Sequence, residues 1–511
     1  MLVQVDSSAI LGVDAYIVEV EVDVAQGQYS FTLVGLPDTA VKESGERVRA
    51  AIRNTGYEFP WNKRITVNLA PADIKKAGPI YDLPIAIGIL GASGQVSREF
   101  LPDMMIVGEL SLDGAVRSVH GVLPMALSAR QAGKKYLIVP EANTREAAVV
   151  DGIAVYPVNS LTDVIRLLED ITAVEPVALD AGSFILDQPV YDVDFSDVKG
   201  QEHVKRALEV AAAGGHNILM IGPPGSGKTM LARRIPTILP PLNLEEALET
   251  TKLFSVSGRL DSSTALITVR PFRSPHHTVS NAGLAGGGAI PVPGEISLAH
   301  HGVLFLDELP EFRRDVLEIL RQPLEDGFVT IARVAGSLTY PARFMMIGAM
   351  NPCPCGFYTD PTRNCTCNPG MIHKYLRRIS GPLLDRIDMH VEVPRLKDQE
   401  LVNQPSGEPS TTIRERVIRA REVQRRRFGN DGVFCNAHMT AKQIRKFCTP
   451  KDDVKDLLRT AINQLNLSAR AYDRILKLAR TIADLEGTDD ITLAHVAEAV
   501  QYRSLDRKLW G

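Results

Sequence analysis

The chain has 511 residues, enough for about three domains of roughly 150 residues each. Hydrophobic residues make up 45% of it and charged residues 23%, which excludes a disordered, collagen-like or coiled-coil protein. The net charge of −4 excludes an overtly basic DNA-coating protein, although it does not exclude a local basic patch.

The first twenty residues contain no basic segment followed by an apolar one, so we expect no secretory signal. The longest apolar stretch, residues 83–92, is shorter than the ~20 residues that a membrane-spanning helix needs. We therefore expect a cytoplasmic protein without a membrane partner.

Residues 1–172 alternate between strand-like and helix-like segments. Residues 17–24 alternate with period two and predict a strand, residues 39–54 predict an amphipathic helix, and residues 64–70 predict another strand. Residues 173–192 show no sustained period and contain two prolines, which predicts a linker.

Residues 193–396 predict a second α/β block. Its apolar runs at 217–222, 302–307 and 343–351 are typical of fully buried strands in a parallel sheet. A polar stretch then marks a boundary, and helical periodicity dominates residues 411–511. The first of those helices carries seven arginines within residues 411–427, which either face DNA or pair with acids, and we favour pairing.

A phosphate-binding motif follows the first buried run of the second block. Its glycines let backbone N–H groups surround a phosphate at a helix N-terminus, whose dipole favours anions. Its lysine is expected to reach the β- and γ-phosphates, and its threonine to ligate Mg²⁺. The motif consists of Gly222, Pro223, Pro224, Gly225, Ser226, Gly227, Lys228 and Thr229.

The second buried run ends in two acids. Asp307 is expected beside the Mg²⁺, and Glu308 is expected to polarise the attacking water. A strand that ends in two acids is a weak signal alone, but after a phosphate-binding motif it is a strong one. The two motifs together predict hydrolysis of a nucleoside triphosphate.

These motifs resemble those of the AAA+ ATPases, in the branch that holds magnesium-chelatase ATPase subunits and MCM helicases. The resemblance implies ATP as the nucleotide, Asn351 as a sensor-1 residue, and Val198 and Gln201 beside the adenine. It also implies an AAA+ α/β core at 193–396 followed by a C-terminal helical lid.

The same resemblance assigns two arginines to catalysis. Arg386 matches the arginine finger, and Arg470, which opens a lid segment, matches sensor 2. The alternative for Arg386 is a surface salt bridge. An arginine finger that one subunit supplies to its neighbour places each active site between two subunits. A head-to-tail interface of this kind closes into a ring. The family implies that the ring is a homo-hexamer.

Residues 1–172 resemble the Lon protease domain, an α+β fold of the S5 D2 type, in segments 76–82 and 108–140. The positions of the Lon nucleophile and base fall on Ile80 and Leu123, which have no such chemistry, so we expect a scaffold without peptidase activity. The domain also resembles one in RadA-type ATPases. Five cations there are expected either to contact DNA or to form a solvated face: Arg47, Arg49, Arg53, Lys63 and Arg64.

The order of these parts resembles the ComM/YifB family of magnesium-chelatase-like proteins. The family implies a hexameric motor that couples ATP hydrolysis to DNA translocation and branch migration during natural transformation. It implies single-stranded or branched DNA in the ring pore and recombination proteins as partners. The alternative is a magnesium-chelatase-like ATPase that remodels a protein partner for metal insertion.

Residues 328–340 predict two short strands around a turn, where MCM-type motors carry a pore hairpin. Arg333 matches the pore lysine of that hairpin and is expected to hold DNA phosphates, with a plain surface residue as the alternative. Residues 270–288 resemble the helix-2 insert of the family, and we assign no catalysis to its two histidines, His276 and His277.

Four cysteines lie close together in the sequence. In extended backbone, the two sulfurs of a Cys-x-Cys pair face the same side. Two such pairs predict either a tetrahedral zinc site or four reduced structural thiols. The four are Cys353, Cys355, Cys365 and Cys367.

Overall fold

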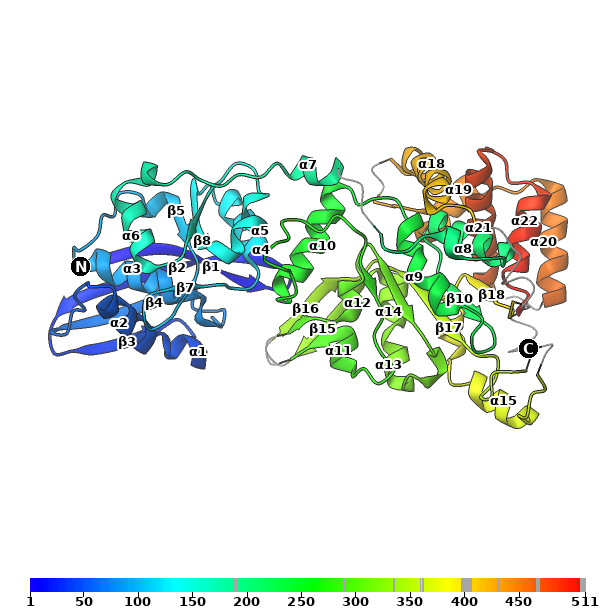
Figure 1. The fold of residues 1–511 in the computed structure, drawn as a ribbon, viewed down its shortest axis with the longest axis horizontal. Coiled ribbons are helices and arrows are strands. Elements are labelled where there is room, and N and C mark those ends of the chain that lie inside the picture. The colour runs from blue at the N-terminus through cyan, green and yellow to red at the C-terminus, as the bar shows by residue number, and fades with distance from the viewer. Residues whose placement is uncertain are drawn as a thin grey trace. The chain divides into compact units, whose positions relative to one another are not determined.

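The computed structural model divides into two compact units (Figure 1). Unit 1 comprises Met1–Asp187 and Asn243–Thr268, and unit 2 comprises Gln188–Leu242 and Val269–Gly511. None of the helices that the structure describes is long and apolar enough to cross a membrane. The described residues are 1–186, 191–288, 291–333, 336–358, 360, 363–396, 407–429, 432–465 and 469–505.

Unit 1 is built on a seven-stranded mixed sheet with the order β3-β4-β2-β1-β5-β8-β9. The predicted strands are β2 and β4, which pair antiparallel, and helix α3 (Asp82–Ala92) is buried along its whole length against β1 and β2. The strands are β1 (Leu2–Leu11), β2 (Asp14–Gln26), β3 (Ser30–Val34), β4 (Lys63–Ala70), β5 (Met104–Ile106), β8 (Tyr136–Pro140) and β9 (Ala154–Val158). Ile80 and Leu123 are both buried apolar side chains in this unit.

The helix predicted at 39–54 is divided into α1 (Thr39–Lys42) and α2 (Ser44–Asn54). The break falls beside Ser44 and Gly45, which are weak helix formers. From α2, the Arg47 guanidinium donates to the buried Asp82 carboxylate, with an Nε–Oδ2 distance of 2.6 Å. Arg47 is therefore part of an internal ion pair rather than of a solvated cationic face.

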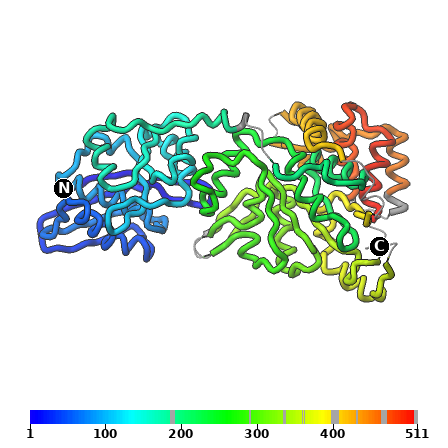
Figure 2. The backbone as a smooth tube through the Cα atoms, viewed as in Figure 1, coloured from blue at the N-terminus to red at the C-terminus, as the bar shows by residue number. Residues whose placement is uncertain are grey.

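One helix of unit 1 comes from the middle of the chain. Helix α10 (Leu244–Val256) follows the helix of the phosphate-binding motif in sequence, yet it packs against α4 (Val122–Gln131). Its Ser255 hydroxyl donates to Glu146 Oε2 at 2.5 Å, and burial raises the pKa of Glu146. The chain thus leaves unit 2, contributes α10 to unit 1 and returns, a path that the tube in Figure 2 follows.

Unit 2 contains a parallel five-stranded sheet with the order β11-β14-β17-β10-β18. The three predicted buried strands are its centre, and every residue of each is buried. Because the strands are parallel, the segments that follow them lie together at the carboxyl ends of the strands. The strands are β10 (Ile218–Ile221), β11 (Phe272–Arg273), β14 (Val303–Leu306), β17 (Met345–Met350) and β18 (Met389–Glu392).

A separate hairpin, β15 (Phe328–Arg333) and β16 (Gly336–Pro341), occupies the predicted place between β14 and β17. The two strands are antiparallel, and Arg333 pairs with Gly336 across the tip. The side chain of Arg333 lies outside the described part of the structure.

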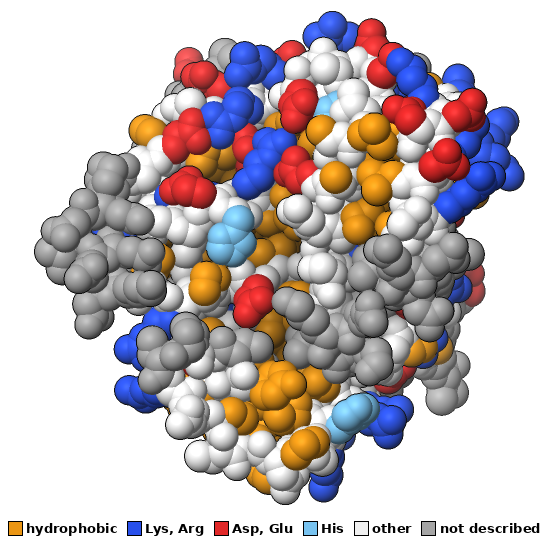
Figure 3. Space-filling model, turned by 90° about the vertical axis from the view of Figure 1, so that its right-hand side faces the viewer, with side chains coloured by type: hydrophobic (Ala, Val, Ile, Leu, Met, Phe, Trp, Pro, Cys, Tyr) orange, Lys and Arg blue, Asp and Glu red, His pale blue; other side chains and the backbone are white. Residues whose placement is uncertain are grey.

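The C-terminal segment is helical, as predicted: α18 (Ser410–Phe428), α19 (Ala441–Phe447), α20 (Asp452–Leu465), α21 (Ala469–Glu486) and α22 (Leu493–Gln501). Arginines of α18 pair with acids, Arg416 with Glu209 and Glu408, and Arg427 with Asp484. Figure 3 shows acidic and basic side chains interspersed over one face of the molecule. The basic helix is thus partly neutralised by its own fold.

Candidate nucleotide-binding site

The phosphate-binding loop joins β10 to α9 (Lys228–Ile238) at the centre of the sheet. Gly225 and Gly227 have φ values of +76° and +90°, a backbone region that favours glycine. A Cβ at Gly222 would lie 2.1 Å from the Val393 carbonyl oxygen, so only glycine fits there. The loop therefore has the tight, backbone-exposing form that an anion-binding turn needs.

The Lys228 ammonium is folded back onto this loop. Its Nζ donates to the carbonyl oxygens of Gly222 at 2.7 Å and Pro223 at 2.9 Å. It also lies 3.3 Å from Oδ1 of Asn351, the residue that follows β17. Burial lowers the pKa of Lys228 to about 8, and the charge of Asp307 opposes that shift.

The side chains of Thr229 and Asp307 contact each other beyond the carboxyl ends of the parallel strands. The threonine hydroxyl donates to Asp307 Oδ2 at 2.7 Å. A hydroxyl and a carboxylate at this spacing are oxygen ligands of the kind that Mg²⁺ prefers, with water and phosphate oxygens completing an octahedron. The donor set fits the predicted ion.

Glu308 follows Asp307 in a left-handed backbone conformation, with φ +51°. Its side chain is 58% exposed, and one carboxylate oxygen lies 3.5 Å from Nδ1 of His277. The sequence did not indicate this histidine as a site residue. His277 lies in the insert and Glu308 follows β14, so their contact depends on the packing of two distant segments, which local sequence patterns do not show. The carboxylate is free to contact a water molecule at the mouth of the site.

The loop and the two acids line a cavity of about 450 Å³, a size suited to a small ligand. Residues 224–230, Asp307, Glu308, Met350 and Asn351 line it. Gln201 supports the loop from outside this lining, because its Nε2 donates to the carbonyl oxygens of Ser226 at 2.9 Å and Pro394 at 3.0 Å. Val198 is fully buried in the core of unit 2.

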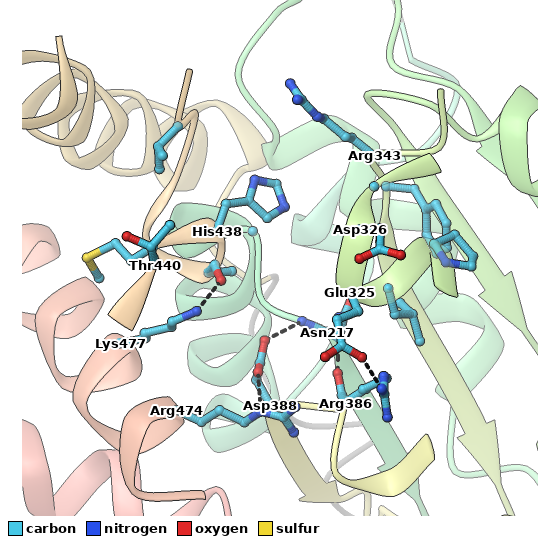
Figure 4. A pocket seen from close by; sticks show the side chains of 18 of the residues that line it. Asn217, Glu325, Asp326, Arg343, Arg386, Asp388, His438, Thr440, Arg474 and Lys477 are labelled. Atoms are coloured by element: carbon cyan, nitrogen blue, oxygen red, sulfur yellow. Dashed lines mark hydrogen bonds and ion pairs between the residues drawn. The ribbon is translucent and has the colours of Figure 1, made fainter. Parts of the chain in front are cut away.

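Arg386 and Arg470 do not line that cavity. Both line a second cavity of about 460 Å³, which Figure 4 shows from close by. Arg386 forms an ion pair with Glu325 and donates to the Pro382 carbonyl oxygen at 2.7 Å. The structure therefore brings the two predicted arginines together and separates them from the phosphate-binding loop of their own chain.

A buried ion-pair network holds this second site in shape. Asp388 accepts from Nδ1 of His216 at 3.3 Å and lies 3.4 Å from Nε of Arg474, which belongs to α21. His216 and Arg474 keep the pKa of the Asp388 carboxyl well below its usual range, against the effect of burial. The network joins α21 to the segment that carries Arg386, because Arg474 also donates from Nη1 to the Ile387 carbonyl oxygen at 3.3 Å.

The four clustered cysteines converge beside the nucleotide site. Their sulfurs lie within 4.8 Å of one another, and Sγ of Cys353 is 3.4 Å from that of Cys355 and 3.7 Å from that of Cys365. These distances are too long for a disulfide. All four are free thiols in the structure, and Cys353 is buried.

A parallel sheet with a phosphate-binding loop after one central strand and an acidic pair after another defines a P-loop protein of the AAA+ class. Three family models match: "Magnesium chelatase, subunit ChlI" over residues 194–401, "Subunit ChlI of Mg-chelatase" over 20–143, and "Magnesium chelatase, subunit ChlI C-terminal" over 407–503.

Several relatives match almost the whole chain. YifB of Salmonella typhimurium is 47% identical over 99% of this chain and 97% of its own length. Competence protein ComM of Haemophilus influenzae is 47% identical over 98% of this chain and 97% of its own. Lon protease 2 of Bacillus subtilis is 34% identical over 28% of this chain and 27% of its own. The chain belongs to the ComM/YifB family of magnesium-chelatase-like AAA+ ATPases, and the predicted fold class is confirmed.

Proposed function

We propose that the protein is a cytoplasmic, homo-hexameric motor that couples ATP hydrolysis to movement along DNA. The main support for ATP hydrolysis is that Thr229, Asp307 and Glu308 lie together at a cavity lined by the phosphate-binding loop. The proposed movement along DNA is supported by the family and by the β15–β16 hairpin, whose first strand ends at Arg333.

Hydrolysis of ATP requires that the triphosphate is bound in a fixed position and that a water molecule is oriented for attack. Lys228 is already placed among loop carbonyl oxygens, and on binding its ammonium exchanges them for phosphate oxygens. Thr229 and Asp307 would hold Mg²⁺, which neutralises phosphate charge when bound. Glu308 accepts the proton of the attacking water, and Asn351, held next to Lys228, orients that water.

Arg386 and Arg470 act on the nucleotide of a neighbouring subunit in this proposal. Their shared cavity excludes their own phosphate-binding loop, which supports a role in trans. An arginine supplied this way stabilises charge on the transferred phosphoryl group and makes each site depend on assembly. The cations nearby, Arg343, Arg474 and Lys477, suit an anionic ligand at that face.

Contact with DNA is assigned to the β15–β16 hairpin. A cation at the tip of a hairpin in each subunit of a ring would hold backbone phosphates in the channel. The net charge of −4 does not oppose this, since only the channel needs to be basic.

The alternative is remodelling of a protein partner, as in a magnesium chelatase, and the three ChlI family matches favour it. The two functions differ in what accelerates hydrolysis. The test is the ATPase rate of the wild type and of Arg333→Ala and Arg333→Lys, with and without forked or single-stranded DNA. We expect stimulation in the wild type and the lysine variant, and its loss in the alanine variant with basal hydrolysis kept.

A further inference from the structure

The four cysteines lie between β17 and α15 (Pro369–Leu376), and Gly356 among them packs against Pro224 of the phosphate-binding loop. In a tetrahedral zinc–thiolate site with Zn–S bonds of about 2.3 Å, neighbouring sulfurs are about 3.8 Å apart. The three sulfur–sulfur distances among Cys353, Cys355 and Cys365 are 3.4, 3.7 and 3.6 Å. The cluster therefore has the dimensions of a site for a single ion.

The surroundings of the sulfurs also suit a bound cation. Backbone N–H groups of Phe357 and Thr366 are directed at the Cys355 sulfur, and the Cys367 N–H donates to Cys365 Sγ at 3.4 Å. Such N–H groups orient and stabilise thiolate ligands in metal sites.

The same loop supports the nucleotide site at two points. Gly356, with φ +86°, packs so closely on Pro224 that a Cβ there would lie 2.5 Å from the proline Cδ. Asn351 precedes the cluster, and its backbone N–H donates to the Tyr375 hydroxyl in α15, which follows the cluster. Gly356 thus contacts the phosphate-binding loop, and Tyr375 contacts the residue that lies next to Lys228.

We propose that Cys353, Cys355, Cys365 and Cys367 bind one structural Zn²⁺, and that this ion clamps the loop against Pro224 and Asn351. The closed set of four thiolates leaves no open position for chemistry, so the ion is structural. Loss of the zinc ion frees the loop from Pro224 and Asn351 and weakens ATP binding, while unit 1 and the C-terminal helices stay folded.

The first experiment measures metal in full-length protein purified without chelators. We expect about one zinc per chain in the wild type, the stoichiometry of a Cys₄ site. Cys365→Ser is expected to lose it, and Cys365→His to retain it because Cys₃His sites also bind zinc. Cys435→Ser, at a buried cysteine outside the cluster, is the control. Wild-type protein without bound metal, or with stoichiometric iron, overturns the proposal.

Replacement by Co²⁺ gives a second readout on wild-type protein, independent of any variant. A tetrahedral thiolate site gives intense sulfur-to-metal absorption and d–d bands, whereas thiols without a site give neither. This signature and the zinc content are read without hydrolysis, so their failure is distinct from failure of the proposed motor function.

The clamp is tested by the affinity for a fluorescent ATP analogue. Gly356→Ala is expected to keep zinc but to raise the Kd by roughly tenfold, an effect typical of residues that support a site. Gly370→Ala, at an exposed position of α15, is the matched control. Unchanged affinity in both Gly356→Ala and Cys365→Ser overturns the clamp.

Discussion

The Thr229 hydroxyl donates a hydrogen bond of 2.7 Å to the Asp307 carboxylate, joining the start of α9 to the end of β14. The two residues are far apart in sequence and meet because β10 and β14 are parallel strands of one sheet, separated by β17. Glu308 is held next to this pair by the chain itself. In the proposed mechanism the adjacent acids have different tasks, Asp307 with the cation and Glu308 with the attacking water.

Glu308→Gln tests the assignment of the base. Glutamine keeps the size and polarity of the side chain but cannot accept the proton of the attacking water. We expect ATP binding to be kept and turnover to fall by about 10²- to 10⁴-fold. Glu311→Gln is the control, because Glu311 pairs with Arg378 and does not line the cavity. Turnover retained in Glu308→Gln would show that another group is the base.

Arg386→Ala tests action in trans. We expect turnover to fall by about 10³-fold or more, as for other arginine fingers, with ATP affinity of the isolated chain unchanged. Arg378→Ala, which removes an exposed guanidinium paired with Glu311, should have little effect.

Mixed rings separate action in trans from action in cis. Random assembly of Arg386→Ala with Glu308→Gln subunits leaves both groups intact at about a quarter of the interfaces of a head-to-tail ring. Recovery of activity to about that fraction is expected. Mixtures as inactive as their components would place Arg386 at its own nucleotide.

The pKa of Lys228 predicts a proton linked to nucleotide binding. Burial lowers this pKa to about 8 in the free site, so the amine is largely neutral at pH 9. Phosphates favour the charged form, so binding at pH 9 takes up a proton and ATP affinity falls as pH rises above 8. Calorimetry in two buffers of different ionisation enthalpy measures the uptake. Lys228→Arg, charged at all these pH values, should show none.

Asp388→Asn tests the buried network. Its folded pKa lies below the unfolded value, so the stabilisation is complete above the unfolded pKa of about 4 and is lost as pH falls through the folded one. Leaving His216 and Arg474 without a buried carboxylate should destabilise unit 2 by about 3–5 kcal/mol at pH 7. The difference from wild type should shrink below pH 4, as measured by thermal unfolding. Asp326→Asn, at an exposed acid of the same cavity, should change stability by less than about 0.5 kcal/mol.

The sequence predicted the features that depend on local pattern. Buried strands such as β10 and β14 follow from uninterrupted apolar runs, and the phosphate-binding loop follows from its motif, in which Gly225 and Gly227 have positive φ. The four cysteines of the two Cys-x-Cys pairs do converge, but not through the extended backbone assumed from their spacing, because Cys353 and Cys355 lie in a turn closed by the Gly356 N–H and the Cys353 carbonyl oxygen.

Features that depend on distant packing were not predictable. The apolar face of α10 shows that the helix needs a partner, but not that the partner is α4 of the N-terminal unit. The approach of His277 to Glu308 and the shared cavity of Arg386 and Arg470 likewise join segments that no short-range periodicity links.

In the proposed function, ATP hydrolysis at this site drives movement on DNA. The most direct measurement is the steady-state ATPase rate of the assembled wild-type protein with and without forked DNA, with Glu308→Gln as the inactive reference. We expect a rate that rises with DNA in the wild type and is lower by at least about 10²-fold in Glu308→Gln. A ring whose hydrolysis is unchanged by any DNA would contradict it.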